Sequence, residues 1–261
     1  MRLDVLLASR GLAGSRSRAQ AMIAAGDVLV SGKKATKSGQ DVPEDAEITV
    51  VSESCPYVSR GGLKLEKAMR EFGIDPKGFV CSDSGASTGG FTDCLLQHGA
   101  AKVYAIDVGT DQLAQKLRDD PRVVNMDKTN IRYLTPEALG EPLDLAVVDV
   151  SFISLHTVLP AVRALLKPSG QIVCLIKPQF EAGRESLGKK GVVRDSAVHA
   201  AVLRNFLSLR TQLGMKLLHL TYSPVRGPEG NIEFLAHLSA DAPDEPVFDV
   251  DALVHQAHEN L

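Results

Sequence analysis

Charged side chains end several short apolar runs that the sequence predicts to be β-strands. Asp83, Asp107 and Asp149 close three such runs, Asp127 follows a fourth, and Lys177 closes a fifth. In an α/β sheet of parallel strands, ligands bind outside the carboxyl ends of the strands. Residues that only fill a core would not be charged at those points. The pattern therefore predicts a ligand site that gathers carboxylates and one lysine at a single edge of the sheet.

The stretch 82–93 joins the first of these runs to an amphipathic segment and is rich in glycine. Glycine lets a backbone pass close to a ligand, and the N–H groups at the start of a helix attract a negative group. The stretch lacks the G-x-G-x-x-G spacing of dinucleotide sites, so it favours a single nucleoside with an amino-acid arm. A glycine turn that binds no ligand remains the alternative.

Two further acids are candidates for contacts with such a nucleoside. Asp107 lies about 20 residues beyond the glycine turn, where a carboxylate can bind ribose hydroxyls; its alternative role is to cap the next helix. Asp127 is predicted to lie near the amino group of an adenine, although 127–130 would also suit a simple turn. The predicted cofactor contacts are Asp83, Gly85, Ala86, Ser87, Thr88, Gly89, Gly90, Phe91, Asp107, Asp127 and Asp149.

Strand-like runs alternate with helical segments through the larger part of the chain, which predicts a mostly parallel sheet covered on both faces, an α/β fold. The loop 224–231 joins the last two strand-like runs without a helix, and this predicts an antiparallel final strand. The strand-like runs are 79–83, 103–107, 123–126, 143–149, 171–177, 217–223 and 232–238. The helical segments are 63–72, 91–98, 112–118, 158–166 and 198–213.

Residues 1–55 are predicted to form a separate small α+β domain. Two helices, one from Leu3 towards Gly11 and one from Ser17 to Gly26, precede a strand, a tight turn and a return strand. A linker is predicted over 56–62, and the large domain over 63–261. Cationic side chains of the small domain are predicted to bind a phosphate backbone, with an ordinary solvated face as the alternative. They are Arg2, Arg16, Arg18, Lys33, Lys34 and Lys37.

The composition, with 44% hydrophobic and 23% charged residues in a chain of 261, is typical of a globular protein. The formal net charge of −3 hides an acidic stretch, 239–261, that contains no Lys or Arg. Four scattered cysteines predict reduced thiols, and no run approaches the roughly 18 apolar residues of a membrane span. The seven histidines lack metal-ligand spacing. We therefore expect a cytoplasmic protein without a metal site, and the sequence implies no oligomer.

Motifs along nearly the whole chain resemble known families. Arg2-Leu3-Asp4 and the stretches 15–20 and 28–33 resemble the S4 RNA-binding domain. The stretches 57–65, 85–93, 148–154, 177–183 and 191–195 resemble, in order, the TlyA family of S4-containing, FtsJ-like ribosomal RNA methyltransferases, often labelled hemolysin A. Ser84 departs from the pattern, because the family more often has an aliphatic residue there.

The resemblance implies a Rossmann-like, S-adenosylmethionine-dependent methyltransferase fold with a seven-stranded sheet, and S-adenosyl-L-methionine as the cofactor. It also implies methyl transfer to a ribose 2′-oxygen, with cytidines of 16S or 23S ribosomal RNA as the targets. FtsJ-like enzymes use a Lys-Asp-Lys-Glu tetrad, which the motifs assign to Lys64, Asp149, Lys177 and Glu233. Further RNA contacts are expected from Arg60, Arg184, Lys189, Lys190 and Arg194.

The role of Lys177 stays open at this point. A neutral amine would accept the proton of the ribose hydroxyl, whereas an ammonium would orient the hydroxyl and stabilise developing negative charge. Burial and a nearby Lys64 favour the neutral form, and Asp149 and Glu233 favour the charged form. The sequence does not decide between these effects.

Three aromatic side chains and two other functions complete the hypotheses. Phe91, Phe152 and Phe180 follow strand ends and either stack a splayed base or belong to the core. A cytolytic hemolysin is the first alternative function, although a spanning segment and a basic amphipathic helix are not evident. An RNA-binding protein with a catalytically silent methyltransferase domain is the second, and the intact tetrad argues against it.

Overall fold

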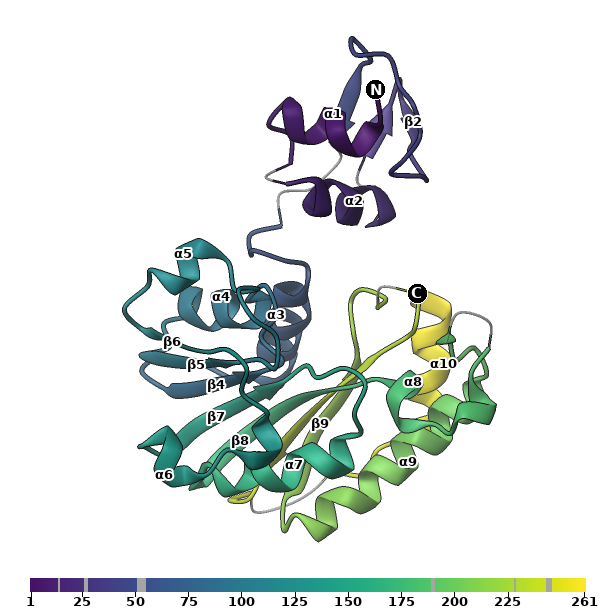
Figure 1. Cartoon of the computed structure of the whole chain (residues 1–261). Helices are drawn as coiled ribbons and strands as arrows, with labels where there is room; N and C mark the ends of the chain where they lie inside the picture. Colours follow the sequence, from purple (N-terminus) through teal and green to yellow (C-terminus); the bar gives the residue numbers. More distant parts are fainter. Residues whose placement is uncertain (14, 26–27, 51–54, 189–190, 228, 243–245) are drawn as a thin grey trace. The chain divides into compact units, whose positions relative to one another are not determined.

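The structure is a computed structural model that describes residues 1–261 except 14, 26–27, 51–54, 189–190, 228 and 243–245. The chain divides into two compact units, Met1–Cys55 and Pro56–Leu261 (Figure 1). The segment 56–62, expected to be a linker, lies within the second unit. There Tyr57 is buried, and the backbone N–H of Val58 donates a hydrogen bond to the Asp93 carboxylate at 2.8 Å.

The small unit packs two helices against a three-stranded antiparallel sheet of order β2-β1-β3. Its apolar core includes Leu3 and Leu7 from the first helix and Ile23 from the second. Ser31 and Gly32 both have positive φ, 50° and 75°, which matches the tight turn predicted between the first two strands. The elements are α1 (Leu3–Ser9), α2 (Arg16–Ala25), β1 (Val28–Val30), β2 (Lys33–Lys34) and β3 (Ile48–Val50).

The large unit is built on a seven-stranded sheet of order β6-β5-β4-β7-β8-β10-β9. Neighbouring strands from β6 to β8 are parallel, and β10 is antiparallel to both β8 and β9, which confirms the antiparallel final strand. The predicted strand-like runs all form strands. They are β4 (Val80–Ser84), β5 (Lys102–Ile106), β6 (Val123–Met126), β7 (Leu143–Val148), β8 (Leu166–Ile176), β9 (Lys216–Tyr222) and β10 (Phe234–Ser239).

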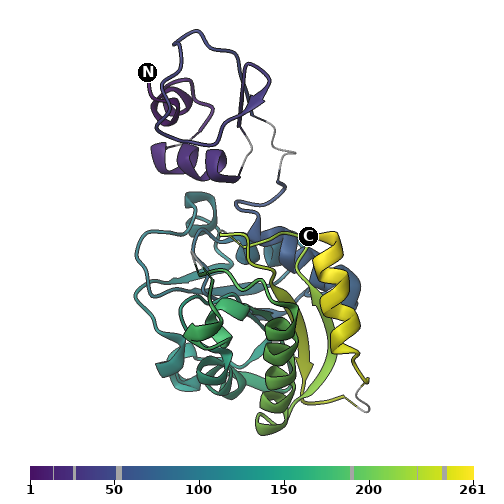
Figure 2. The same ribbon diagram turned by 90° about the vertical axis from the view of Figure 1, so that its right-hand side faces the viewer.

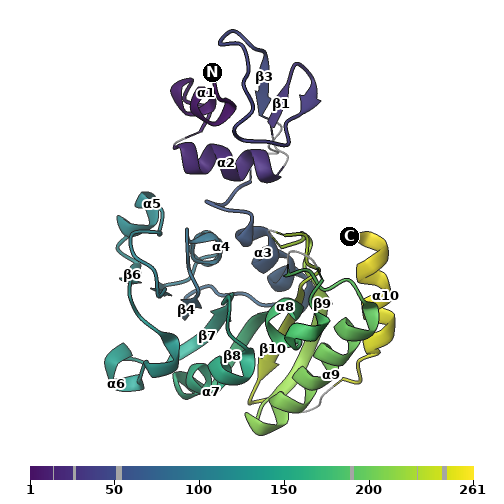
Figure 3. The same ribbon diagram turned by 45° about the vertical axis from the view of Figure 1, so that its right-hand side comes forward.

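Helices cover both faces of this sheet (Figures 1 and 3). The helices α3 and α4 pack together over β4 and β10, while α7, α9 and α10 contribute to the main apolar core on the opposite face. The longer helices are α3 (Gly61–Phe72), α4 (Gly90–Gln97), α7 (Leu155–Ala164), α9 (Ser196–Gln212) and α10 (Val250–Asn260). The short ones are α5 (Gln115–Arg118), η1 (Ile131–Tyr133), α6 (Pro136–Leu139), α8 (Pro178–Glu181) and η2 (Arg184–Ser186).

The last part of the acidic C-terminal stretch forms helix α10, Val250–Asn260. It lies beside α9 (Figure 2), and its residues Val250, Val254 and Ala257 are buried in the main core. Its apolar positions recur at helical spacing, so the burial of one face explains why this polar stretch forms a helix. Among the described residues, the helices are all too short or too polar to cross a membrane.

Candidate active site

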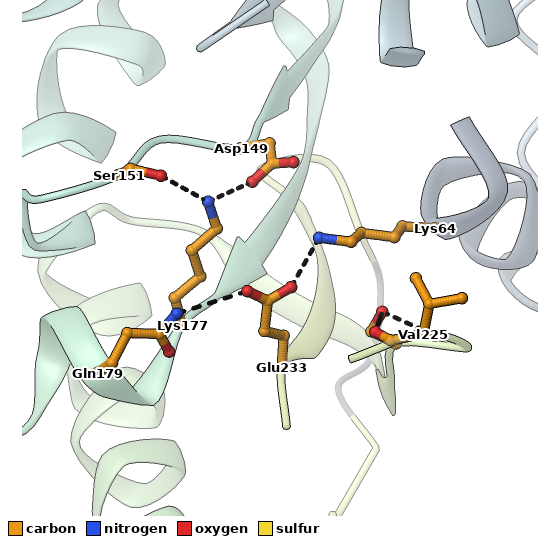
Figure 4. Close-up of polar contacts among 8 residues, drawn as sticks. Lys64, Asp149, Ser151, Lys177, Gln179, Val225 and Glu233 are labelled. Atoms are coloured by element: carbon orange, nitrogen blue, oxygen red, sulfur yellow. Dashed lines mark hydrogen bonds and ion pairs between the residues drawn. The ribbon is translucent and has the colours of Figure 1, made fainter. Parts of the chain in front are cut away.

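Two buried ion pairs lie at one edge of the sheet, as Figure 4 shows. The Nζ of Lys64 is 2.6 Å from Oε2 of Glu233, and the Nζ of Lys177 is 2.6 Å from Oδ1 of Asp149. Lys64, Lys177 and Glu233 are only 8%, 9% and 1% exposed. Charges this well buried are rarely retained for stability alone, because their desolvation offsets much of their attraction. The structure thus brings together the four residues that the resemblance assigns to the tetrad.

The topology of the sheet explains how these residues meet. Asp149 follows β7 and Lys177 follows β8, and these strands are parallel neighbours, so both residues lie at the carboxyl edge. Glu233 instead precedes a strand. Because β10 runs antiparallel to β8 and pairs Phe234 with Ile176, the start of β10 lies at the same edge. The one reversed strand therefore delivers a carboxylate that a parallel strand would place at the opposite end.

Other side chains support the two pairs. Ser151 Oγ accepts a hydrogen bond from Lys177 Nζ at 3.0 Å, and Gln179 Nε2 donates one to Glu233 Oε1 at 3.5 Å. A Cβ at Gly227 would lie 2.5 Å from Glu233 Oε1, so glycine lets its loop close over that carboxylate. These three contacts were not predicted from the sequence. Ser151 and Gln179 lie within the motifs 148–154 and 177–183, so their motif positions could have identified them as candidates for the site.

A second buried lysine, Lys67, lies one helical turn after Lys64 on α3. Its Nζ donates to the carbonyl of Tyr222 at 2.7 Å and lies 3.8 Å from the centre of the Tyr222 ring. The backbone N–H of the next residue, Ser223, donates to the carbonyl of Glu233 at 2.8 Å. Burial lowers the pKa of Lys67. This residue therefore ties α3 to the end of β9, close to the backbone that carries Glu233.

The glycines in the turn between β4 and α4 are needed for two different physical reasons. Gly85 has a φ of 89°, and a Cβ there would lie 2.5 Å from the carbonyl oxygen of Asp149, so the turn passes close to the neighbouring strand end. A Cβ at Gly89 would meet Leu117 at 2.3 Å, and one at Gly90 would meet Ser59 Oγ at 2.3 Å. The absence of side chains at Gly89 and Gly90 is therefore required by packing within the protein, whether or not a ligand approaches.

The remaining turn residues differ in exposure. Ala86 is buried, whereas Ser87 is exposed with a φ of 48°, and the Thr88 carbonyl accepts a hydrogen bond from Ala114 N. Phe91 is only 3% exposed, so its ring belongs to the core.

Asp83 is a fully buried carboxyl group at the end of β4. Its Oδ2 accepts hydrogen bonds from the backbone N–H of Thr92 at 2.9 Å and from Thr92 Oγ1 at 2.7 Å, which caps the start of α4. Burial, with smaller contributions from Asp149 and Asp107, raises the pKa of Asp83 to about 7. Its Oδ1 is buried and has no hydrogen-bond partner among the described residues. A cationic ligand group at this oxygen would relieve an unfavourable burial.

Asp107 and Asp127 lie at the ends of the next two strands. The carboxylate of Asp107 accepts hydrogen bonds from Ser87 N at 2.8 Å and Gly109 N at 2.7 Å, which ties the glycine turn to the end of β5. Asp127 accepts one from Asp111 N at 3.1 Å. Both acids are partly exposed, so their remaining acceptor sites are open to a ligand.

These residues fit the cofactor that the sequence suggests. Asp83 offers a buried acceptor to an amino group, Asp107 offers a carboxylate to ribose hydroxyls, and Gly85 admits a close backbone approach. The described residues contain no group of three or more His, Cys, Asp or Glu side chains arranged for a metal ion.

Two aromatic side chains lie beside the Lys177–Asp149 pair. Phe152 is 90% exposed and has a φ of 63°, which is uncommon for a bulky residue. Its ring centre is 5.0 Å from that of Phe180, and Lys177 Nζ is 5.8 Å from the Phe180 ring. An exposed, backbone-strained aromatic residue next to buried charges is available to a planar ligand.

Most of the predicted RNA-binding cations that the structure describes are exposed. Arg2 and Arg16 are 48% and 59% exposed in their side chains and contact Asp4. The other exposed cations are Lys33, Lys34, Lys37, Arg60, Arg184 and Arg194. The side chain of Arg18 and the residues Lys189 and Lys190 lie outside what the structure describes.

Comparisons with known proteins agree with this architecture. The chain matches the FtsJ-like methyltransferase family over residues 57–240 and the S4 domain family over residues 1–48. It is 46% identical, over 238 residues covering 91% of this chain and 89% of the relative, to the 16S/23S rRNA (cytidine-2′-O)-methyltransferase TlyA of Mycobacterium tuberculosis. Hemolysin A of Brachyspira hyodysenteriae is also 46% identical over 238 residues, covering 91% of this chain and 99% of that protein.

Solved structures extend the comparison. A structure from Streptococcus thermophilus named as a candidate hemolysin has a TM-score of 0.81 and 44% identity, covering 100% of this chain and 96% of that one. An S-adenosylmethionine-dependent methyltransferase from Mesorhizobium loti, at 15% identity, has a TM-score of 0.51 over 69% of this chain and 100% of its own, and shares the fold. These findings confirm the resemblance and the fold class predicted from the sequence. The chain therefore belongs to the FtsJ-like methyltransferase family, in its TlyA branch, with an S4 domain preceding the methyltransferase domain.

Proposed function

We propose that this protein transfers a methyl group from S-adenosyl-L-methionine to the ribose 2′-oxygen of a cytidine in 16S or 23S ribosomal RNA, or in both. The observation that carries the proposal is the pair of buried ion pairs, Lys64–Glu233 and Lys177–Asp149, at the carboxyl edge of a methyltransferase sheet. The named activity of the TlyA relative supports the choice of substrate. Other relatives are named hemolysins, and we do not carry that activity over to this chain. Because the proposed substrate is ribosomal RNA, we expect the protein to act in the cytoplasm.

The cofactor would be held by the residues at the ends of β4, β5 and β6. Asp83 would bind its amino group, Asp107 its ribose and Asp127 its adenine, with the backbone of the glycine turn, from Gly85 to Gly90, alongside. When bound, S-adenosylmethionine supplies a methyl group made electrophilic by the positive sulfur. The protein's own contribution is to exclude water and to align the attacking oxygen, which together account for much of the rate in such displacements.

We infer that Lys177 works as an ammonium that orients the ribose hydroxyl. Its Nζ forms an ion pair with Asp149 Oδ1 at 2.6 Å and donates a hydrogen bond to Ser151 Oγ at 3.0 Å. Another N–H group is available to the 2′-oxygen, where it would stabilise developing negative charge, and the hydroxyl proton would leave to solvent once the methyl group is transferred. Lys64 and Glu233 form the second buried ion pair of the site, and the exposed Phe152 is available to stack on the target base.

The small unit is proposed to dock the RNA. Its exposed cations suit a phosphate backbone, and Arg60, Arg184 and Arg194 add charge on the large unit. Charge contacts of this kind fix where the RNA lies without reading its sequence, so the choice of nucleotide rests with the site around Phe152.

The test is methylation of unmodified RNA. Purified protein is incubated with tritiated S-adenosylmethionine and in vitro transcripts of 16S and 23S ribosomal RNA, or ribosomal subunits from cells that lack the modification. Label should appear as 2′-O-methylcytidine, which resists alkaline hydrolysis. Transfer to a base instead of a ribose, or no transfer to any of these substrates, contradicts the proposal.

A matched pair of variants ties the activity to the site. Lys177→Met removes the lysine paired with Asp149, and Lys167→Met removes a lysine that pairs with Asp144 at 2.5 Å at the other end of the same two strands. We expect Lys177→Met to lower the rate at least about 100-fold and Lys167→Met to leave it nearly unchanged. Equal effects of the two substitutions would mean that the lysine at the carboxyl edge has no special part in the reaction.

A further inference from the structure

A buried acid, Asp4, lies in the first turn of α1 in the small unit. Its side chain is 0% exposed and lies between two arginines, Arg2 and Arg16, while Asp41 is paired with Arg2 in a β-bridge. Arg2 Nε donates to its Oδ1 at 3.0 Å, and Arg2 Nη2 donates to its Oδ2 at 3.0 Å, a fork that matches the planar guanidinium to the carboxylate. Gln20 Nε2 from α2 donates to Oδ2 at 2.7 Å.

A second guanidinium reaches the same oxygen. Arg16 Nη2 lies 3.7 Å from Asp4 Oδ2, so Arg2 and Arg16 are held beside one another although they belong to separate segments. Both keep about half of their surface exposed, and the Arg2 guanidinium lies against Gly39, where a Cβ would be 3.5 Å from three of its atoms. The arrangement presents two cations outward while their inner edges are fixed by one buried carboxylate.

The electrostatics agree with this geometry. The hydrogen bonds from Arg2, and then the one from Gln20, hold the pKa of Asp4 well below its usual range, so the carboxylate stays ionised. A long, flexible arginine side chain loses conformational entropy when it binds a phosphate, and a preformed fork reduces that loss.

We propose that Asp4 is a positioning residue that preorganises Arg2 and Arg16 to bind neighbouring phosphates of structured RNA. The inference rests on the proposed RNA-docking function of the small unit and adds to it a specific role for an acid. Asp4 lowers the net positive charge of the surface and raises its affinity for RNA. A surface that acted only through its total charge would bind RNA more tightly if Asp4 lost its charge.

The test exploits these opposite signs. Asp4→Asn keeps the shape of the side chain, and the Gln20 amide can turn over to restore its own bond, but an Asn can accept only one of the two Arg2 bonds. Glu47→Gln is the matched control, since it removes one negative charge from an exposed position of the same unit. Gln20→Ala separates the tie between α1 and α2 from the positioning of the arginines. All variants are made in the full chain, and their folding is checked by circular dichroism.

Binding is measured with in vitro transcripts of 16S and 23S ribosomal RNA and, as a probe of non-specific attraction, with heparin. We expect Asp4→Asn to raise the Kd for the transcripts about tenfold and to reduce the steepness of its salt dependence by about one unit of slope, without weakening heparin binding. Glu47→Gln and Gln20→Ala should bind the transcripts within about twofold of the parent. Transcript binding by Asp4→Asn that equals or exceeds that of Glu47→Gln overturns the inference, as does a loss in Gln20→Ala as large as in Asp4→Asn.

Arg2→Lys gives a second, independent route, because it keeps the charge but cannot form the fork. If Asp4 acts by positioning Arg2, the double variant with Asp4→Asn should bind little worse than either single variant. Fully additive losses in folded variants would contradict the inference. If the parent protein bound neither the 16S nor the 23S transcript, the proposed function would itself fail, an outcome distinct from equal binding by the parent and Asp4→Asn.

Discussion

The buried carboxyl group of Asp83 predicts a pH-dependent affinity for the cofactor. Burial raises the pKa of Asp83 to about 7 in the protein described here, and its Oδ1 faces no hydrogen-bond donor among the described residues. A cofactor amino group bound at that oxygen would favour the carboxylate, so binding must release the proton wherever Asp83 carries one. Affinity should therefore increase as pH rises towards and beyond 7.

The size of the effect follows from the pKa. With a pKa of about 7, about ten in eleven Asp83 carboxyls are protonated at pH 6 and about one in four at pH 7.5. If the complex holds only the carboxylate, the Kd should be about eightfold higher at pH 6 than at pH 7.5. S-adenosylhomocysteine is a suitable ligand because it carries the amino group and cannot react.

Isothermal titration calorimetry at the two pH values, in two buffers with different ionisation heats, measures both the Kd and the number of protons released. Asp83→Asn should bind more weakly at pH 7.5 and should lose the pH dependence. Asp144→Asn, which alters a carboxylate at the opposite end of the sheet, should retain it. A Kd that is the same at both pH values in the parent protein, with no proton release, would refute the reasoning.

Three other predictions concern catalysis, acid stability and packing. Asp149→Ala should abolish methyl transfer with a retained fold, measured by tritium incorporation and circular dichroism. His199 is fully buried, its Nδ1 lies 2.8 Å from His258 Nε2, and burial lowers its pKa to about 4, so the unfolded chain binds a proton more readily between pH 6.5 and 4. Stability should fall by about 2 kcal/mol on this account from pH 7 to pH 5, and urea unfolding of His199→Gln should not show that part of the loss. Ser84→Ala should raise the free energy of unfolding by about 1 kcal/mol, because the buried Ser84 hydroxyl has no hydrogen-bond partner among the described residues; a decrease would show that the hydroxyl is satisfied.

Much of the fold was predictable because its signals are local. Apolar runs of strand length alternate with helical segments, and the helix-free loop 224–231 indicated the reversal of the final strand, which the structure confirms. The sequence motifs alone identified the family. The end positions of strands also pointed to a site, since the carboxyl ends of parallel strands meet at one edge.

Other features depend on contacts between distant residues and have no local signal. The pairing of Lys64 with Glu233 joins residues 169 positions apart, and it requires both the antiparallel entry of β10 and the packing of α3 over it. The packing reasons for Gly89 and Gly90 lie in side chains from other segments, Leu117 and Ser59, which a one-dimensional pattern does not reveal.

By itself, the sequence determined the order of the elements, the α/β class and the identity of the charged residues at the strand ends, because backbone propensity and hydrophobic periodicity act over a few residues. Only the tertiary structure decided which charges pair, how deeply each is buried and which polar atoms stay unpaired. Those properties arise from three-dimensional packing and from the removal of water, and they set the electrostatics of the site. Asp4 is buried and Phe152 is exposed, the opposite of what the two residue types alone would predict.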